Sequence, residues 1–150
     1  MTNIIGEFRN TIESSAAQLA KISEEESQRT RGSGKWSKRE ILGHLIDSAA
    51  NNHQRFVRAQ LTPSLSFPGY EQERWVAIQQ YQEAAWSELC TLWKCYNVHL
   101  LHVAARIPED FLDRSCSIGS GNPVTLRFLL TDYVAHLQHH LRQILASHLE

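Results

Sequence analysis

The sequence predicts an all-α protein, a four-helix bundle that forms a single domain over residues 1–150. Apolar residues recur every three or four positions in several long segments, which is typical of amphipathic helices. Clusters of turn-forming residues separate those segments. The length of 150 residues also lets one domain bury a full core. Four helices of these lengths commonly pack as a bundle.

The first helix is expected from about Asn3 to Arg29. Its apolar residues follow the spacing of a helix that buries one face. The sequence Arg-Gly-Ser-Gly-Lys at 31–35 ends it, because glycine disfavours a continuing helix. The apolar positions are Ile4, Ile5, Phe8, Ile12, Ala16, Leu19 and Ile22.

The second helix is expected to begin after Ser37 and to continue to about Gln60. Ser37 and Glu40 form the S-x-x-E signature of a capping box, which satisfies two backbone N–H groups at a helix start. An apolar run follows directly. Residues 63–69 contain two prolines, two serines and a glycine, and we expect them to form a loop.

The third segment runs from Tyr70 to about Ile107 and is rich in Trp, Tyr and Leu. It is expected either as one bent helix or as a short helix followed by a long one. Pro108 ends it. Its tryptophans have two open interpretations, an isologous dimer interface or core packing, and they are Trp75, Trp86 and Trp93.

The fourth helix is expected to follow an irregular crossover over residues 109–122, which ends in Gly-Ser-Gly-Asn. Asn122 offers an N-cap and Pro123 suits the first helical position, where no backbone N–H is needed. The helix should reach about His148.

The charge balance excludes an electrostatic case for nucleic-acid binding. The chain has 15 basic and 16 acidic side chains and a formal net charge of −1. A basic cluster lies at residues 29–39, but acidic residues flank it, so we expect a solvated linker there rather than a polyanion site. We therefore expect no nucleic-acid partner.

The sequence also argues against a membrane protein. No apolar run approaches the roughly 18 residues that cross a bilayer. The first residues, M-T-N-I-I-G-E-F-R, lack the basic start and long apolar stretch of a signal peptide. A cytoplasmic location with no membrane partner is the resulting expectation.

Three histidines in two distant helical segments point to metal chemistry. His136 and His140 are four residues apart, so they project from one face of a helix about one turn apart. His44 lies in the second helix. Neutral imidazole is the commonest protein ligand of borderline transition metals, and three such ligands leave positions free for water or substrate. Histidine pairs at this spacing also occur on plain helix surfaces, so spacing alone leaves that interpretation open.

The helical wheel of the fourth helix separates its histidines. At 100° per residue, His140 lies about 60° from the apolar centre, His136 about 100° and His139 about 160°. His139 should therefore face solvent, while the other two flank the edge of the core. In the second helix, His44 shares a polar stripe with other side chains that could line a pocket, and they are Ser48, Asn51 and Arg55.

Two motifs resemble those of the DinB-like superfamily of metalloenzymes. The first is W-S-x-x-E-I-L-G-H-L-I-D-S at residues 36–48, and the second is Y-x-x-H-x-x-H-H-x-x-Q-I at residues 133–144. The resemblance spans most of the chain. It implies a bundle of up-down-down-up topology, often dimeric, with one divalent metal. Matched motif to motif, the implied ligands are His44, His136 and His140.

The resemblance also implies a class of chemistry. Relatives include bacillithiol and mycothiol S-transferases, a mycothiol-dependent maleylpyruvate isomerase and proteins named metal-dependent hydrolases. The predicted function is a metal-dependent enzyme that activates a low-molecular-weight thiol, or water, for attack on a small electrophile. Zinc, nickel or iron would suit three imidazoles. Because no separate general base is evident, thiol transfer is favoured over hydrolysis.

Further residues are candidates for roles around the metal. We expect three to bind an anionic substrate or thiol carboxylate, namely Asn51, Arg55 and Gln143. Three others could orient the imidazoles, namely Asp47, Ser48 and Asp132, although the two carboxylates could equally be ordinary charges on a helix face. The alternative function is a non-catalytic, metal-stabilised bundle that serves as a stress-response or dimerisation module. A homodimer is the expected oligomeric state.

Overall fold

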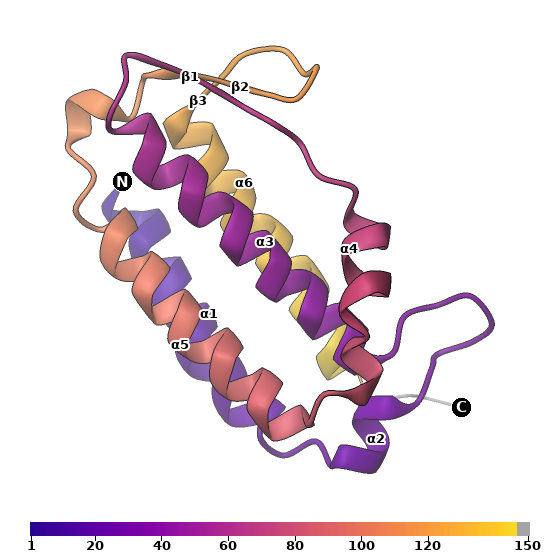
Figure 1. Ribbon diagram of the computed structural model, residues 1–150. Coiled ribbons are helices and arrows are strands. Elements are labelled where there is room, and N and C mark those ends of the chain that lie inside the picture. The colour runs from indigo at the N-terminus through magenta and orange to yellow at the C-terminus, as the bar shows by residue number, and fades with distance from the viewer. Residues whose placement is uncertain (147–150) are drawn as a thin grey trace.

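Four long helices form the bundle in the computed structural model, which describes residues 1–146 (Figure 1). They are α1 (Thr2–Leu19), α3 (Lys38–Ala59), α5 (Trp86–Ala104) and α6 (Leu126–Leu145). Helices α1 and α3 each pack against both α5 and α6. The predicted all-α four-helix bundle is confirmed, whereas the up-down-down-up order stays a prediction. No helix within residues 1–146 is long and apolar enough to cross a membrane.

The core lies where the inward faces of these four helices meet. Trp86 and Trp93 are 2% and 0% exposed, so core packing accounts for both of them. Trp75 is 38% exposed and lies on the outer helix α4 (Gln72–Gln79). Of the three tryptophans that could have formed an interface, only Trp75 therefore remains available on the surface.

The first predicted helix is in fact two. Helix α1 ends at Leu19, and a separate five-residue helix, α2, covers Glu24–Gln28. The side chain of Ser23 accepts a hydrogen bond from the backbone N–H of Glu26 and caps α2. The expectation of one helix to Arg29 was wrong because apolar spacing does not register a local cap that restarts the helix.

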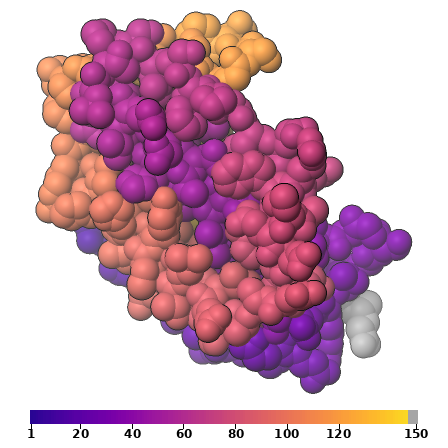
Figure 2. Space-filling view, in the orientation of Figure 1, coloured from indigo at the N-terminus to yellow at the C-terminus, as the bar shows by residue number. Residues whose placement is uncertain are grey.

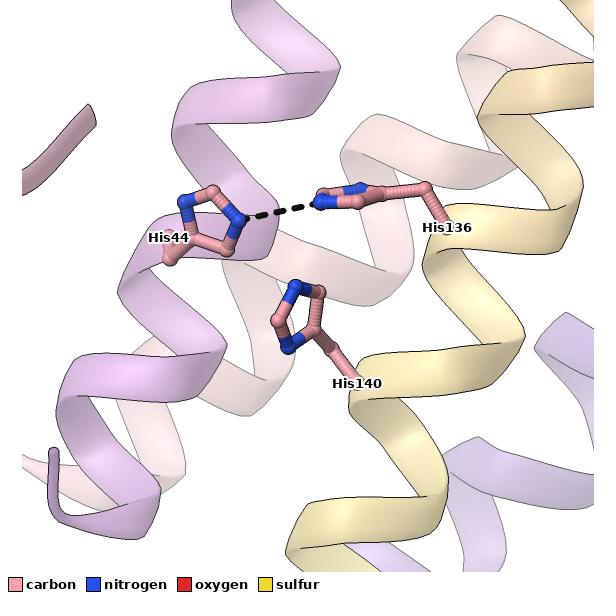
Figure 3. Close-up of side chains that lie close together, drawn as sticks. All are labelled: His44, His136 and His140. Carbon is pink, nitrogen blue, oxygen red and sulfur yellow. Dashed lines mark hydrogen bonds between the residues drawn. The ribbon is translucent and has the colours of Figure 1, made fainter. Parts of the chain in front are cut away.

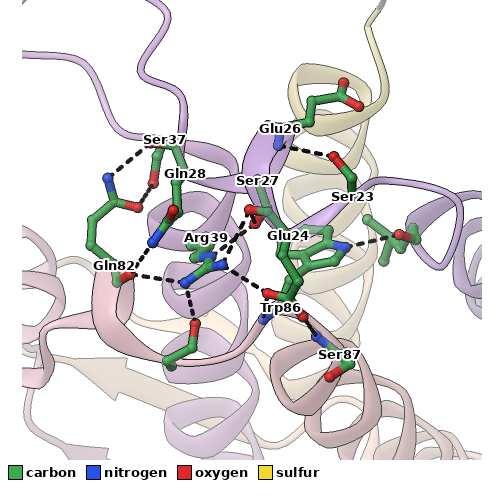
Figure 4. Close-up of polar contacts among 12 residues, drawn as sticks. Ser23, Glu24, Glu26, Ser27, Gln28, Ser37, Arg39, Gln82, Trp86 and Ser87 are labelled. Carbon is green, nitrogen blue, oxygen red and sulfur yellow. Dashed lines mark hydrogen bonds and ion pairs between the residues drawn. The ribbon is translucent and has the colours of Figure 1, made fainter.

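A polar network holds α2 against the start of α3 and α5 (Figure 4). The guanidinium of Arg39, only 6% exposed, pairs with the Glu24 carboxylate at 2.7 Å and donates to the carbonyl oxygens of Gln82 and Ala84. The Glu24 carboxylate also accepts the backbone N–H of Trp86 at 2.7 Å. This part of the basic cluster is therefore buried and paired, which corrects the expectation of a solvated linker.

A small sheet covers the end of the bundle where α3 ends and α6 begins (Figure 1). Strand β1 (Ser64–Phe67) pairs in parallel with β2 (Ser115–Ile118), which pairs antiparallel with β3 (Val124–Thr125). The expectation of a loop at 63–69 and an irregular crossover at 109–122 was wrong in these places. Strands of two to four residues are too short to show a periodic pattern.

Strand β3 also moves the start of the last helix. Val124 pairs with Cys116, so the chain is still extended after Pro123. Thr125 is the N-cap, and its hydroxyl oxygen accepts the backbone N–H of Phe128 at 3.0 Å. The cap predicted at Asn122 was therefore three residues early. Helix α6 ends at Leu145, and the predicted end at His148 lies outside the described residues.

The third segment is a short helix followed by a long one, α4 and then α5, joined by the single turn η1 (Tyr81–Glu83). Helix α4 lies along α3, and the space-filling view shows it covering part of that helix (Figure 2). Gly43 permits the close approach of η1 to α3, because a Cβ at this position would clash with the Tyr81 ring. This contact fixes the covering segment next to the histidine-bearing turn of α3.

Candidate metal centre

Helices α3 and α6 bring the three predicted histidines together. Figure 3 shows His44 from α3 facing His136 and His140 from α6. One ring nitrogen from each of the three lies within 4.8 Å of the others. The Nε2 atoms of His44 and His136 are 3.1 Å apart. Residues separated by 92 positions in the sequence thus form one cluster.

These distances suit a shared metal ion. A ring nitrogen binds zinc at about 2.0–2.1 Å, so two nitrogens on one ion lie about 2.9 to 3.4 Å apart, depending on the angle between them. The His44–His136 separation of 3.1 Å falls in that range. The three residues therefore fit a divalent transition metal.

The environment keeps the imidazoles neutral, which is the form that binds a metal. Burial, together with the neighbouring rings of His136 and His140, lowers the pKa of His44 to about 3. Burial and His140 lower the pKa of His136 to about 4. The pKa of His140 is also lowered, chiefly by burial. At neutral pH no proton needs to leave before these rings bind a cation.

Gln143 sets the orientation of His140. Its side-chain oxygen lies 2.8 Å from Nδ1 of His140, so that nitrogen is the protonated donor and Nε2 is left free as a ligand atom. The predicted substrate-binding role of Gln143 remains a prediction, but its carbonyl oxygen is already engaged with His140. His139 is exposed, as the helical wheel predicted, and is not one of the three clustered histidines.

His44 is almost fully enclosed, with 1% of its surface exposed. The Trp36 ring lies beside it, with the ring centroids 5.1 Å apart. Its Nδ1 atom is buried without a hydrogen-bond partner among the described residues. Its other ring nitrogen, Nε2, points into the cluster and lies 3.1 Å from Nε2 of His136.

Asp47 lies one turn after His44 and faces α4. Its Oδ1 atom accepts hydrogen bonds from the Tyr81 hydroxyl at 2.6 Å and from the Gln79 amide at 2.8 Å. Its Oδ2 atom is buried and has no partner within the described chain. Burial raises the pKa of Asp47. The structure gives Asp47 no hydrogen bond to an imidazole within residues 1–146, so its predicted orienting role is still a prediction.

A cavity of about 230 Å³ adjoins His136. It lies between α3, α6 and the segment that leads into α4. Two predicted candidates, Arg55 and Asp132, line it with opposite charges, and Ser48 also contributes to its wall. The sequence did not indicate the other polar lining residues, which are Asn52, Tyr70, Gln72 and Tyr133.

The position of Asn51 differs from that of Asn52 for a geometric reason. On the wheel of α3, Asn51 lies about 20° to one side of His44 and Asn52 about 80° to the other, toward α6. Asn51 accordingly lines a neighbouring cavity, and its amide donates to the Asp47 carbonyl oxygen at 2.9 Å. The polar stripe was therefore recognised, but not which of its two edges faces the histidines. Its predicted substrate contact stays a prediction.

Comparison with known proteins identifies relatives along nearly the whole chain. The family model described as the DinB superfamily matches residues 7–144. A protein of Oceanobacillus iheyensis named "Putative metal-dependent hydrolase" is 26% identical over 143 residues, which are 95% of this chain and 76% of that protein.

Two solved structures share the fold. YfiT from Bacillus subtilis, described as a probable metal-dependent hydrolase with an unusual four-helix-bundle topology, superposes with a TM-score of 0.81 at 19% identity, over 93% of this chain and 83% of that one. A mycothiol-dependent maleylpyruvate isomerase superposes with a TM-score of 0.76 at 14% identity, over 95% of this chain and 60% of that one. At such identities the likeness concerns the fold alone.

Proposed function

Because the chain belongs to the DinB superfamily, we propose that it is a metal-dependent enzyme whose single divalent ion is held by His44, His136 and His140. The observation that carries the proposal is the convergence of three neutral imidazoles beside a cavity. The name of the Oceanobacillus relative supports metal dependence. Zinc, nickel and iron are all compatible with an all-imidazole site.

The proposed reaction is attack by a low-molecular-weight thiol on a small electrophile. A divalent ion with three uncharged ligands keeps its full positive charge and lowers the pKa of a bound thiol or water, which supplies a nucleophile near neutral pH. Gln143 holds His140 in the tautomer that presents Nε2. Trp36 packs beside His44 and shields it from solvent, and charge interactions are stronger where water is excluded.

Arg55 is the best-placed residue to hold an anionic group of the substrate, because it lines the cavity next to His136. A substrate that extends from Arg55 toward the histidines would occupy this cavity. The proposed partners are therefore a small thiol and a small electrophile.

Water is the second candidate nucleophile, and the specific support for it is the hydrolase name carried by the Oceanobacillus protein. A non-catalytic, metal-stabilised bundle is the remaining alternative. The cavity of about 230 Å³ beside His136 favours an enzyme, since a purely structural metal needs no adjoining space.

The first test is the metal content of protein purified without a polyhistidine tag. Zinc, nickel and iron are each quantified per chain for the wild type, His44→Ala and His140→Ala. We expect about one ion per chain in the wild type and none in either variant. His139→Ala is the matched control, because this neighbouring histidine is exposed, and it should keep the ion.

Two outcomes would contradict the metal site. Wild-type protein that stays metal-free after zinc and nickel are added would remove the enzyme proposal. Equal loss of metal in all three variants would refute the choice of ligands.

The nucleophile is tested separately with metal-loaded protein. Thiol consumption with a model electrophile is compared with hydrolysis of an activated ester in the absence of thiol. We expect metal-dependent thiol transfer that His44→Ala abolishes. Ester hydrolysis that is metal-dependent and indifferent to thiol would favour water instead.

A homodimer remains part of the proposal, with the exposed Trp75 on α4 as a candidate contact. Light scattering of the wild type and Trp75→Ala tests it. A monomeric wild type would exclude the dimer without affecting the metal site.

A further inference from the structure

Two opposite charges line the cavity beside His136 without pairing with each other. Arg55 projects from α3 and Asp132 from α6. Neither side chain makes a hydrogen bond or ion pair within residues 1–146, whereas other arginines of α3 are bonded: Arg39 to Glu24 and Arg58 to Gln54. The two charged groups thus face a shared space rather than one another.

Of these two residues, Arg55 gives the stronger evidence for a ligand-binding site. Its Nε atom is buried and has no partner in the described chain. A buried donor without a partner is costly, and a guanidinium is costlier than a neutral group. Burial lowers the pKa of Arg55, while Tyr70 and Asp132 act in the opposite direction. An anionic group in the cavity could supply the missing partner.

A planar carboxylate suits this position. The guanidinium presents parallel N–H donors that match the two oxygens of a carboxylate. The Phe67 ring, 6.0 Å from the guanidinium carbon, flanks the side chain and narrows its range of orientation.

Asp132, which is solvent-exposed, adds a negative charge to the wall of the cavity that Arg55 also lines. It lies one helical turn before His136 and is close enough to oppose the lowering of the pKa of His136. A second carboxylate or a phosphate near Asp132 would be repelled. A cationic group on the ligand would instead be attracted, so the two wall charges together match a ligand that carries both signs.

We propose that this cavity binds a small zwitterion of the α-amino acid type, with its carboxylate on Arg55, its ammonium group on Asp132 and its side chain directed toward His136. The proposal rests on the proposed function, since an amino acid with a thiol side chain would then present sulfur to the metal. Ser48 and Asn52 on the α3 wall offer further polar contacts.

The size of the cavity agrees with such a ligand. A volume of about 230 Å³ corresponds to roughly seven or eight water molecules at about 30 Å³ each. A compound of similar size to L-cysteine would fit within it.

The test compares three thiols by calorimetry on metal-loaded protein. L-cysteine has both charged groups, 3-mercaptopropanoate lacks the ammonium group, and cysteamine lacks the carboxylate. We expect L-cysteine to bind at least about tenfold more tightly than either analogue, as a charge-assisted hydrogen bond would give. Metal content is measured again afterwards, so that loss of metal to the free thiol is detected.

Two variants assign the contacts. Arg55→Gln should remove the advantage of L-cysteine over cysteamine and keep its advantage over 3-mercaptopropanoate. Asp132→Asn should remove the advantage of L-cysteine over 3-mercaptopropanoate and keep its advantage over cysteamine. Arg58→Gln is the matched control, because Arg58 is an exposed arginine on the same helix outside the cavity lining, and it should change neither ratio. Equal affinity for the three compounds, or unchanged ratios in both variants, would overturn the proposal.

A metal-free experiment separates this inference from the proposed function. L-serine, 3-hydroxypropanoate and ethanolamine are titrated into chelator-treated protein and followed by NMR. The same order of preference with lower affinity is expected, because Arg55 and Asp132 remain in place. Preference for L-serine in a protein that never binds metal would uphold the zwitterion site and refute the metal enzyme. A protein that binds one ion per chain but does not prefer L-serine would uphold the metal site and refute the zwitterion site.

Discussion

Removing the titratable ring at position 44 should change how the stability of the metal-free protein depends on pH. The perturbation is His44→Gln, which keeps a polar side chain but cannot bind a proton near neutral pH. In the folded chain His44 is 1% exposed, and burial together with the two other imidazoles lowers its pKa to about 3. In the unfolded chain its pKa returns to the ordinary value of about 6.5.

The sign follows from proton uptake. Between pH 6.5 and 3 the unfolded chain holds a proton on His44 that the folded chain does not, so the free energy of unfolding falls as the pH falls. At pH 7.5 both states are essentially neutral there. At pH 5 the unfolded state is favoured by about 2 kcal/mol through this one residue, from about 1.4 kcal/mol per pH unit over roughly 1.5 units below 6.5.

The assay is urea unfolding at pH 7.5 and pH 5.0 with a chelator present. The wild type should lose about 2 kcal/mol more than His44→Gln between the two pH values. Titrating groups outside the histidine cluster act in both proteins and cancel in the difference. Taking the difference also removes any direct effect of the substitution on stability at pH 7.5.

Parallel pH profiles for the two proteins would refute the reasoning. They would mean that His44 is protonated in the folded metal-free chain at pH 5, and so that it is not enclosed as the structure places it. If the wild type lost less stability than the variant between pH 7.5 and 5.0, the enclosure of His44 would be contradicted even more strongly.

Two further substitutions test the packing behind the site and the orientation of its ligands. Gly43→Ala should lower the free energy of unfolding by about 1 to 3 kcal/mol through overpacking against Tyr81, although alanine is the better helix former. Gly6→Ala, on a helix position with nothing within 4 Å of the added Cβ, should instead raise it by up to about 1 kcal/mol, and both are measured by urea unfolding. Gln143→Leu should weaken metal affinity about 10- to 100-fold, because it removes the hydrogen bond to a metal-binding imidazole. Gln138→Leu, which removes a hydrogen bond toward α1, should leave the affinity unchanged in a competition titration with a chromogenic chelator, and equal losses would contradict the orienting role.

The sequence predicted the parts of the fold that are determined by local residue patterns. The capping box at Ser37 and Glu40 forms as predicted, with both reciprocal hydrogen bonds present. The break after Leu19 was missed because the Ser23 cap that restarts the helix leaves no trace in the apolar spacing, and the strand over Val124 and Thr125 because it depends on pairing with β2. A two-residue strand exists only because β2 lies beside it.

The same division applies to the site. Helical periodicity placed His136 and His140 at the core edge and His139 in solvent, and it placed His44 in a polar stripe of the second helix. The resemblance then matched the same three histidines as ligands. Asn52 was missed because the sequence did not show which edge of the polar stripe faces α6. Tyr70 was missed because its place in the cavity depends on how the 68–71 segment crosses α3. No local pattern in the sequence encodes that crossing.

The segment from Tyr70 to Tyr81 lies beside two different parts of the site, the histidine cluster and the cavity. At one end, Tyr81 packs on Gly43 and donates to Asp47, which anchors the segment beside His44. At the other end, Tyr70 forms part of the cavity wall and contributes nothing to the cluster of ring nitrogens. Because the three histidines of the proposed metal site come from α3 and α6, substitutions at Tyr70 are expected to change which ligand fits without loss of the ion. The metal centre and the ligand selectivity of this fold can therefore vary independently, which is the arrangement expected of a scaffold that serves several chemistries.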